Sequence, residues 1–220
     1  MRTDPFSDTW QFLIAAQDDQ LALGPWRWIL VGLFVLLLLG SLMVAAREWI
    51  VDPAQRTGRD LVMWLVRTAV GGMWFQAIFW KLPLFTTNNG LHYWTSQEVK
   101  YAAFQIHRDL VAQVLLPTPQ FYVLNVVVFA TELAFAISLM LGIGVRVAGA
   151  IGVLFLAQLW LGLYQHPQEW PWTYIFLGGL MGLFSVCGAG RSLGLDAALR
   201  REYPLTMTND VMRAFVRLAT

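Results

Sequence analysis

Charged residues are scarce in this chain, which excludes an ordinary soluble domain. Only 13% of the 220 residues are Asp, Glu, Lys or Arg, while 57% are hydrophobic. Soluble domains carry about a quarter of charged residues. At ~20 residues per span, a chain of this length can cross a bilayer several times. The net charge of +1 gives no reason to expect a nucleic-acid partner. We therefore expect an all-α polytopic protein of a prokaryotic-type inner or plasma membrane, surrounded by membrane lipid.

Cysteine and histidine are also rare, which limits the redox groups that the chain can hold. The single cysteine, Cys187, excludes an internal disulfide and a CxxC redox pair. The three histidines, His92, His107 and His166, fall outside the apolar runs, so the spans offer no axial ligand for a b-type haem. Metal-ligand spacings, phosphate loops and dinucleotide fingerprints are absent as well. We expect no haem, metal or organic cofactor bound by this chain itself.

Apolar segments divide the chain into membrane spans. Eleven tryptophans occur, and several stand at segment ends, as in an interfacial aromatic belt. The predicted organisation is an outer N-terminal segment over 1–25, a first transmembrane helix over 26–47, a four-helix membrane domain over 60–200 and a cytoplasmic tail over 201–220. The five apolar segments are Trp28–Ala46, Leu61–Leu84, Phe121–Gly142, Val145–Gln165 and Trp172–Cys187.

The distribution of arginine and lysine predicts the orientation. With the N-terminus outside, nine arginines fall on the cytoplasmic side and four cations on the other, which favours an N-out, C-in topology. The nine are Arg47, Arg56, Arg59, Arg146, Arg191, Arg200, Arg201, Arg213 and Arg217, and the four are Arg2, Arg27, Lys100 and Arg108.

The long connection between the second and third segments, on the outer side, predicts a further helix over 95–116. Thr95 and Glu98 have the spacing of a capping box, and Pro117 ends the run of apolar residues at intervals of three and four. We expect this helix to lie in the outer interface, with its apolar stripe turned to lipid or to the bundle. A soluble docking helix is the alternative.

Two ionisable residues inside the spans suggest a buried ion pair. Arg67 stands six residues from the cytoplasmic end of its span, about 9 Å, and Glu132 ten residues from the end of its own, about 15 Å. An unpaired guanidinium at that depth costs roughly 3 kcal/mol or more. We therefore predict an Arg67–Glu132 pair, which either takes part in chemistry or only locks two helices together.

Other polar and aromatic residues point to a polar seam between the helices. Lys81 returns to nearly the same helix face as Arg67, and either snorkels to the outer interface or lines a cleft with it. Gln158 contributes a polar position to the fourth segment, and Trp74 and Phe75 are the aromatic candidates for contacting a bound ring. His166, in an outer turn, is the candidate for proton exchange at the mouth of the seam.

Three ordered stretches resemble the DoxX/DoxD family of small polytopic membrane proteins. The first runs from Arg67 through Gly71 to Lys81, with aromatic residues where the family usually has a glycine before the lysine. The second runs from Glu132 through Gly142 to Arg146. The third is the closing signature Gly190-Arg191-Ser192-Leu193-Gly194-Leu195-Asp196. The resemblance covers roughly residues 60–200.

The resemblance implies a DoxX-like four-helix transmembrane bundle with one additional N-terminal transmembrane helix. It also implies a function, since DoxD-type members form the membrane subunit of thiosulfate:quinone oxidoreductase. Quinone would then be the substrate, with Arg67 or Lys81 polarising its carbonyl and Glu132 relaying a proton. Other subunits of an oxidoreductase complex, or further copies of the chain, are the expected protein partners.

Two other functions are considered against the sequence. A non-catalytic accessory or anchoring subunit of a larger electron-transfer complex would use the small residues Gly178, Gly179 and Gly182 for helix–helix assembly. A transporter would need inverted repeats or broken helices, and neither is evident.

Overall fold

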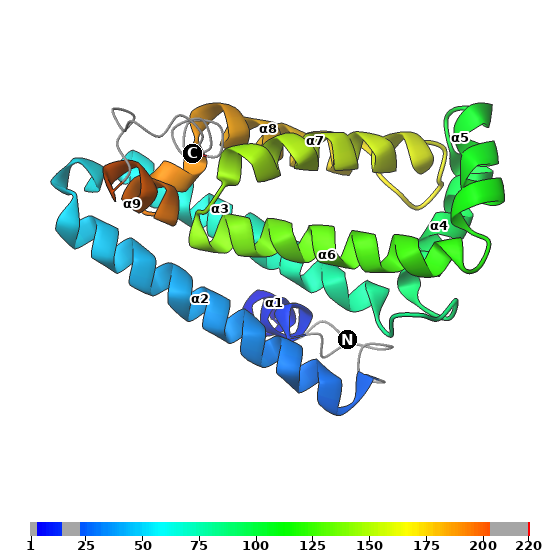
Figure 1. Cartoon of the computed structure of the whole chain (residues 1–220), viewed down its shortest axis with the longest axis horizontal. Coiled ribbons are helices and arrows are strands. Elements are labelled where there is room, and N and C mark those ends of the chain that lie inside the picture. The colour runs from blue at the N-terminus through cyan, green and yellow to red at the C-terminus, as the bar shows by residue number, and fades with distance from the viewer. Residues whose placement is uncertain (1–3, 15–22, 203–219) are drawn as a thin grey trace.

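Helices make up all the regular structure that the computed structural model describes, which covers residues 4–14, 23–202 and 220 (Figure 1). Four of them are long and apolar enough to cross a membrane. They are α2 (Pro25–Val51), α3 (Gly58–Ala77, extended by the 3₁₀ turn η3, Ile78–Lys81), α6 (Gln120–Leu141) and α7 (Val145–Gly162). The fifth predicted span is a shorter apolar helix, α8 (Pro171–Cys187). Most of the predicted tail over 201–220 and part of the segment over 1–25 lie outside the described residues.

The helix boundaries follow local sequence signals. Proline occupies the first turn of α1 (Pro5–Leu13), α2 and α8, where its missing N–H costs nothing. Thr57 caps α3 by accepting a hydrogen bond from the amide of Asp60. Gly142, with a φ of 70°, ends α6 and allows the chain to turn directly into α7.

Two helix pairs form the body of the molecule. The antiparallel helices α3 and α6 contact each other along their length, and so do α7 and α8. Gly149 brings α7 close to α8, since a Cβ there would lie 2.9 Å from that of Ser185. Gly178 and Gly182 of α8 face Leu156 and Val153 of α7 at ordinary van der Waals distance. These two small residues of α8 therefore serve packing within the chain.

The long connection after α3 is broken where the sequence predicted one helix over 95–116. It forms α4 (Gly90–Tyr101), α5 (Gln105–Leu110) and the π turn η4 (Val111–Leu115). Asn89 caps the start of α4 by accepting a hydrogen bond from the amide of His92, so the helix begins six residues before the predicted cap at Thr95. The break at Ala102 comes from tertiary contacts: the amide of Ala103 donates to the carbonyl of Leu161, and the amide of Gln165 to that of Tyr101. The connection is thereby tied to the end of α7.

The opposite end of the molecule holds α9 (Leu195–Glu202) and the turn between α2 and α3 (Figure 1). Asp196, fully buried, accepts hydrogen bonds from the amides of Gly144 (2.7 Å) and Val145 (3.2 Å) and so caps α7. Burial raises the pKa of the Asp196 carboxyl, while these two amides act in the opposite direction. Arg201 binds both oxygens of the buried Glu48, at 2.8 and 2.9 Å, and fastens α9 to α2.

Candidate functional site

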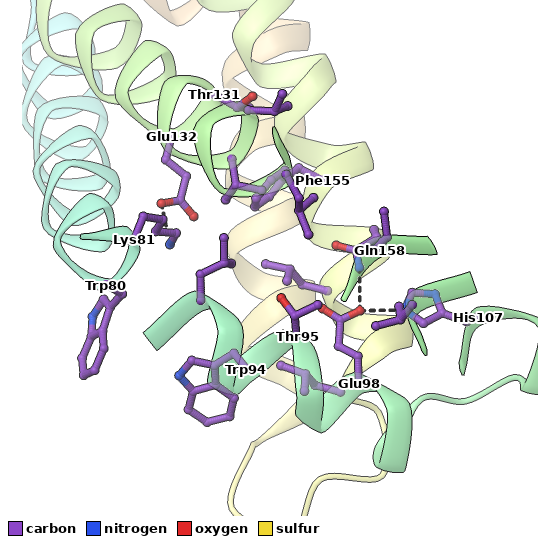
Figure 2. A pocket seen from close by; sticks show the side chains of 18 of the residues that line it. Trp80, Lys81, Trp94, Thr95, Glu98, His107, Thr131, Glu132, Phe155 and Gln158 are labelled. Atoms are coloured by element: carbon purple, nitrogen blue, oxygen red, sulfur yellow. Dashed lines mark hydrogen bonds and ion pairs between the residues drawn. The ribbon is translucent and has the colours of Figure 1, made fainter. Parts of the chain in front are cut away.

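A cavity of about 530 Å³ lies between the α3–α6 pair and the α7–α8 pair, and α4, α5 and η4 close it at one end. This volume is within the range of roughly 300–1,000 Å³ that is usual for small-molecule sites. Figure 2 shows the polar side chains of its wall in two groups. Most of the wall is apolar and aromatic: Trp80, Leu91, Trp94, Leu110, Val111, Leu115, Leu124, Val127, Val128, Phe155, Leu159, Leu163 and Tyr174.

The first polar group is an ion pair between Lys81 and Glu132. The Lys81 Nζ lies 2.6 Å from the Glu132 Oε2, and only 7% and 4% of these residues are exposed. Lys81 also donates to the carbonyl of Ala77 at 3.0 Å, and the buried amide of Asn125 donates to the carbonyl of Lys81 at 3.1 Å. The lysine is therefore held in place against α6, and the predicted snorkelling to the interface is wrong.

The predicted Arg67–Glu132 pair is also wrong. Arg67 is fully buried, but its guanidinium donates to the carbonyl of Leu139 and, at 3.4 Å, to that of Ser192. Helical side chains lean toward the N-terminus of their helix. Because α3 and α6 are antiparallel, this tilt carries Arg67 toward the α9 end and Glu132 toward the α4 end. The same tilt brings Lys81 and Glu132 together.

The second polar group joins three helices around Glu98 of α4. Its Oε2 lies 2.7 Å from the Nε2 of His107 on α5 and 2.8 Å from the Nε2 of Gln158 on α7. Glu98 is only 6% exposed. The carboxylate fits against α7 because residue 162 is glycine: a Cβ there would collide with the Glu98 side chain. All three residues line the cavity.

Glu98 was misread as a capping residue, and so was Thr95. Both are buried, and both line the cavity from the middle of α4. A signal was present, since a glutamate stands among the apolar positions of the predicted helix. A carboxylate on an apolar face needs partners. Those partners, His107 and Gln158, are 9 and 60 residues away, so sequence spacing did not reveal them.

The remaining predicted site residues fall into two classes. Gln158 lines the cavity. Trp74 and Phe75 do not line it, since they are buried in the core, where Trp74 packs edge-on against Phe135 and Phe155. His166 is buried outside the cavity wall, with its ring against those of Trp94 and Tyr101.

The exposed part of the wall indicates where the cavity opens. Leu110 of α5 and Val127 of α6 are 50% and 54% exposed, Trp80 of η3 is 42% exposed, and Gln158 of α7 is also exposed. Because Val127 and Gln158 stand on α6 and α7, we infer that the space between these two helices is the opening. The surface beside it is apolar, with Val123 and Leu154 both exposed. The opening therefore suits a molecule that arrives along the apolar side of the helices.

Chemically, the site combines an apolar interior with two acid–base pairs, Lys81–Glu132 and His107–Glu98. Such a wall can hold a largely apolar ligand and donate hydrogen bonds to its few polar atoms. In the described ranges, no group of three or more His, Cys, Asp and Glu side chains gathers as a metal site. No family model matches the chain, and neither does any curated protein or solved structure.

Proposed function

We propose that this chain is a membrane subunit of a quinone-linked oxidoreductase and that its cavity binds the quinone. The observation that carries the proposal is the ion pair of Lys81 and Glu132, buried in the wall of an otherwise apolar cavity. Ionisable residues are expensive inside a membrane and commonly mark functional sites there.

A quinone matches this wall in both shape and polarity. Its ring is flat and apolar, and aromatic side chains such as Phe155, Trp94 and Tyr174 offer it packing surface. Its carbonyl oxygens accept hydrogen bonds, which the ammonium of Lys81 can donate. Reduction of a quinone to a quinol takes up two electrons and two protons. Glu132, in direct contact with Lys81, is the group we assign to proton transfer at this carbonyl.

The position of the opening supports a ligand that is dissolved in the membrane. If α2, α3, α6, α7 and the shorter α8 all span the bilayer with the N-terminus outside, the space between α6 and α7 faces lipid in the outer half. The seven described arginines of the proposed cytoplasmic side then belong to segments at or near the α9 end, as the positive-inside rule requires. A quinone with an isoprenoid tail can enter sideways from that lipid.

The electron donor in this proposal is thiosulfate, the donor of the enzymes that the sequence resembles. It is a dianion and would approach from water on the outer side. There, Arg108 already donates to the carbonyl of Ala102 and to Gln165, while Lys100 is exposed. Two thiosulfate dianions would couple through a new sulfur–sulfur bond to give tetrathionate and release two electrons. The quinone would take up these two electrons together with two protons, which pass through the cavity wall, and leave as the quinol.

The alternative of an anchoring subunit has less support. Its sequence argument was the row of small residues on α8, but Gly178 and Gly182 pack against α7 of the same chain. The third glycine of that row, Gly179, has open space around it. An anchoring role also leaves the cavity and its buried ion pair unexplained.

Binding of a quinone to the purified protein tests the proposal. The protein is placed in lipid nanodiscs, and a decyl-benzoquinone is titrated while the quenching of tryptophan fluorescence is followed. We expect saturable binding to the wild type and at least tenfold weaker binding to Lys81→Met, since a hydrogen bond from a charged donor contributes about 1.5–3 kcal/mol. Lys100→Met, an exposed lysine outside the cavity, is the matched control. Equal binding by all three proteins, or no saturable binding, contradicts the proposal.

A further inference from the structure

The second polar group of the cavity has no role in the function proposed so far. Glu98, His107 and Gln158 come from α4, α5 and α7, whereas Lys81 and Glu132 come from η3 and α6. Figure 2 shows the two groups on different parts of the wall, with apolar side chains such as Phe155 between them. A ligand that fills the space is therefore in contact with two separate sets of polar atoms.

The second group has the construction of a binding subsite. One carboxylate oxygen of Glu98 takes both the His107 ring nitrogen at 2.7 Å and the Gln158 amide nitrogen at 2.8 Å. Three helices are needed to assemble it, and glycine at 162 leaves the room that the carboxylate requires. A buried carboxylate adds little to stability compared with an apolar residue of similar size. Its placement on a cavity wall therefore points to a ligand.

The proposal rests on the proposed function and specifies its ligand. We propose that Glu98, His107 and Gln158 hold a second polar atom of the ligand, so that the site selects a ring with oxygen atoms at two opposite ends. Lys81 binds the first oxygen, and a donor of the second group binds the other. A para-quinone or its quinol has this pattern, whereas a ring with a single oxygen satisfies only one of the two groups.

Gln158 also indicates how the ligand lies. It is exposed at the opening, while its amide nitrogen contacts the buried Glu98. The second oxygen therefore lies nearer to the opening than the first, and the apolar tail leaves between Val127 and Leu110 into the surrounding lipid. Both residues line the cavity and are about half exposed.

Two probes with the same decyl tail test the inference, one a benzoquinone and one a phenol with a single ring oxygen. Each is titrated into the wild type and the variants Gln158→Leu, His107→Leu and Lys81→Met in nanodiscs. We expect the wild type to bind the quinone about tenfold more tightly than the phenol, because one further hydrogen bond is made. In each variant the ratio of the two dissociation constants falls to about one.

The ratio of the two dissociation constants, quinone against phenol, distinguishes failure of this inference from failure of the proposed function. If the wild type binds neither probe, both are overturned. If the ratio falls in Lys81→Met but keeps its wild-type value in Gln158→Leu and His107→Leu, the second subsite is overturned and quinone binding stands. Gln105→Leu, on the exposed face of α5, is the control. Gln158 is itself exposed, so its replacement should leave the fold intact, which thermal unfolding of each variant checks.

Discussion

The Nζ of Lys81 lies 2.6 Å from the Oε2 of Glu132, and both side chains are buried. The pair joins the end of α3 to the middle of α6 beside the cavity. Removing one partner of such a pair leaves a charge in an apolar environment, while removing both does not. Its contribution to stability can therefore be measured separately from the role in ligand binding that we propose for it.

Glu132→Leu should destabilise the protein more than the double variant Lys81→Met/Glu132→Leu. Breaking a buried pair by removing one partner costs about 3–5 kcal/mol, whereas apolar replacement of both partners is often close to neutral. Thermal unfolding in detergent micelles measures the difference. A double variant less stable than Glu132→Leu would show that the pair does not act as a unit.

Glu132→Gln tests the proposed function of the same carboxylate. Since glutamine cannot transfer a proton, quinone turnover should fall, and full turnover in this variant would exclude proton transfer by Glu132.

Arg67→Leu should lower stability and leave quinone binding unchanged. Arg67 is fully buried and donates to the carbonyls of Leu139 and Ser192, away from the cavity wall. Arg67→Lys should retain part of the stability, because it keeps one charged donor but not the planar fork. The unfolding temperature and the dissociation constant of decyl-benzoquinone are measured on the same samples. Loss of binding in a stably folded Arg67→Leu protein would contradict this prediction and give Arg67 a part in ligand binding.

Val127→Trp should slow the entry of a long-tailed quinone. Val127 is 54% exposed and lines the cavity at the opening between α6 and α7. A tryptophan there fills the opening, and the association rate measured by stopped-flow quenching should fall severalfold. Val123→Trp is the matched control, because Val123 lies one turn earlier on the same helix, is 65% exposed and does not line the cavity. Equal association rates for the two variants would place the entrance elsewhere.

Gly162→Ala should weaken quinone binding without removing any polar atom. The added methyl group collides with the Glu98 carboxylate, which must then leave its place between His107 and Gln158. Gly179→Ala is the control, because open space surrounds Gly179. We expect at least a severalfold rise in the dissociation constant for the first variant and no change for the second. Unchanged binding by Gly162→Ala would mean that the position of Glu98 is unimportant.

Asp196 should contribute a pH-dependent change to stability. Since burial raises the pKa of the Asp196 carboxyl in the folded state above its ordinary value, its protonated form is favoured by folding, and stability falls as the pH rises through the folded-state pKa. Asp196→Asn should remove this contribution and keep an acceptor for one of the two amides, Gly144 or Val145, that now donate to separate carboxylate oxygens. Asp196→Ala should cost about 1 kcal/mol or more, as the cap of α7 is lost. Thermal unfolding at pH 4 and pH 7 distinguishes the three proteins.

The apolar segments of the sequence correctly predicted the four long apolar helices of the described residues, because span length and hydropathy are local properties. The first was predicted to end at 47 and continues to Val51, and the second ends at Lys81 in a 3₁₀ turn. The Arg67–Glu132 pairing failed because depth counted along a helix axis ignores the direction of the side chain. Helical side chains lean toward the N-terminus of their helix, and when this direction is taken into account, Lys81 is the expected partner of Glu132.

The second polar group lay beyond what spacing could reveal. Thr95 and Glu98 had the spacing of a capping box, yet Asn89 begins the helix. Likewise, the broken connection after Tyr101 depends on bonds to α7, more than 50 residues later in the chain. Lys81, Glu132 and Gln158, which were predicted from the sequence, line the cavity, and so do Glu98 and His107, which were not predicted because their positions depend on how the connection folds back.

The two backbone bonds that tie the connection to the end of α7 have a consequence for observing the cavity. The amides of Ala103 and Gln165 are each bonded to a carbonyl on the other segment, Leu161 and Tyr101 respectively. Their exchange with solvent deuterium requires the two segments to separate. A ligand held between α4 and α7 opposes that separation, so these two amides form a natural reporter of occupancy that needs neither a label nor a turnover assay.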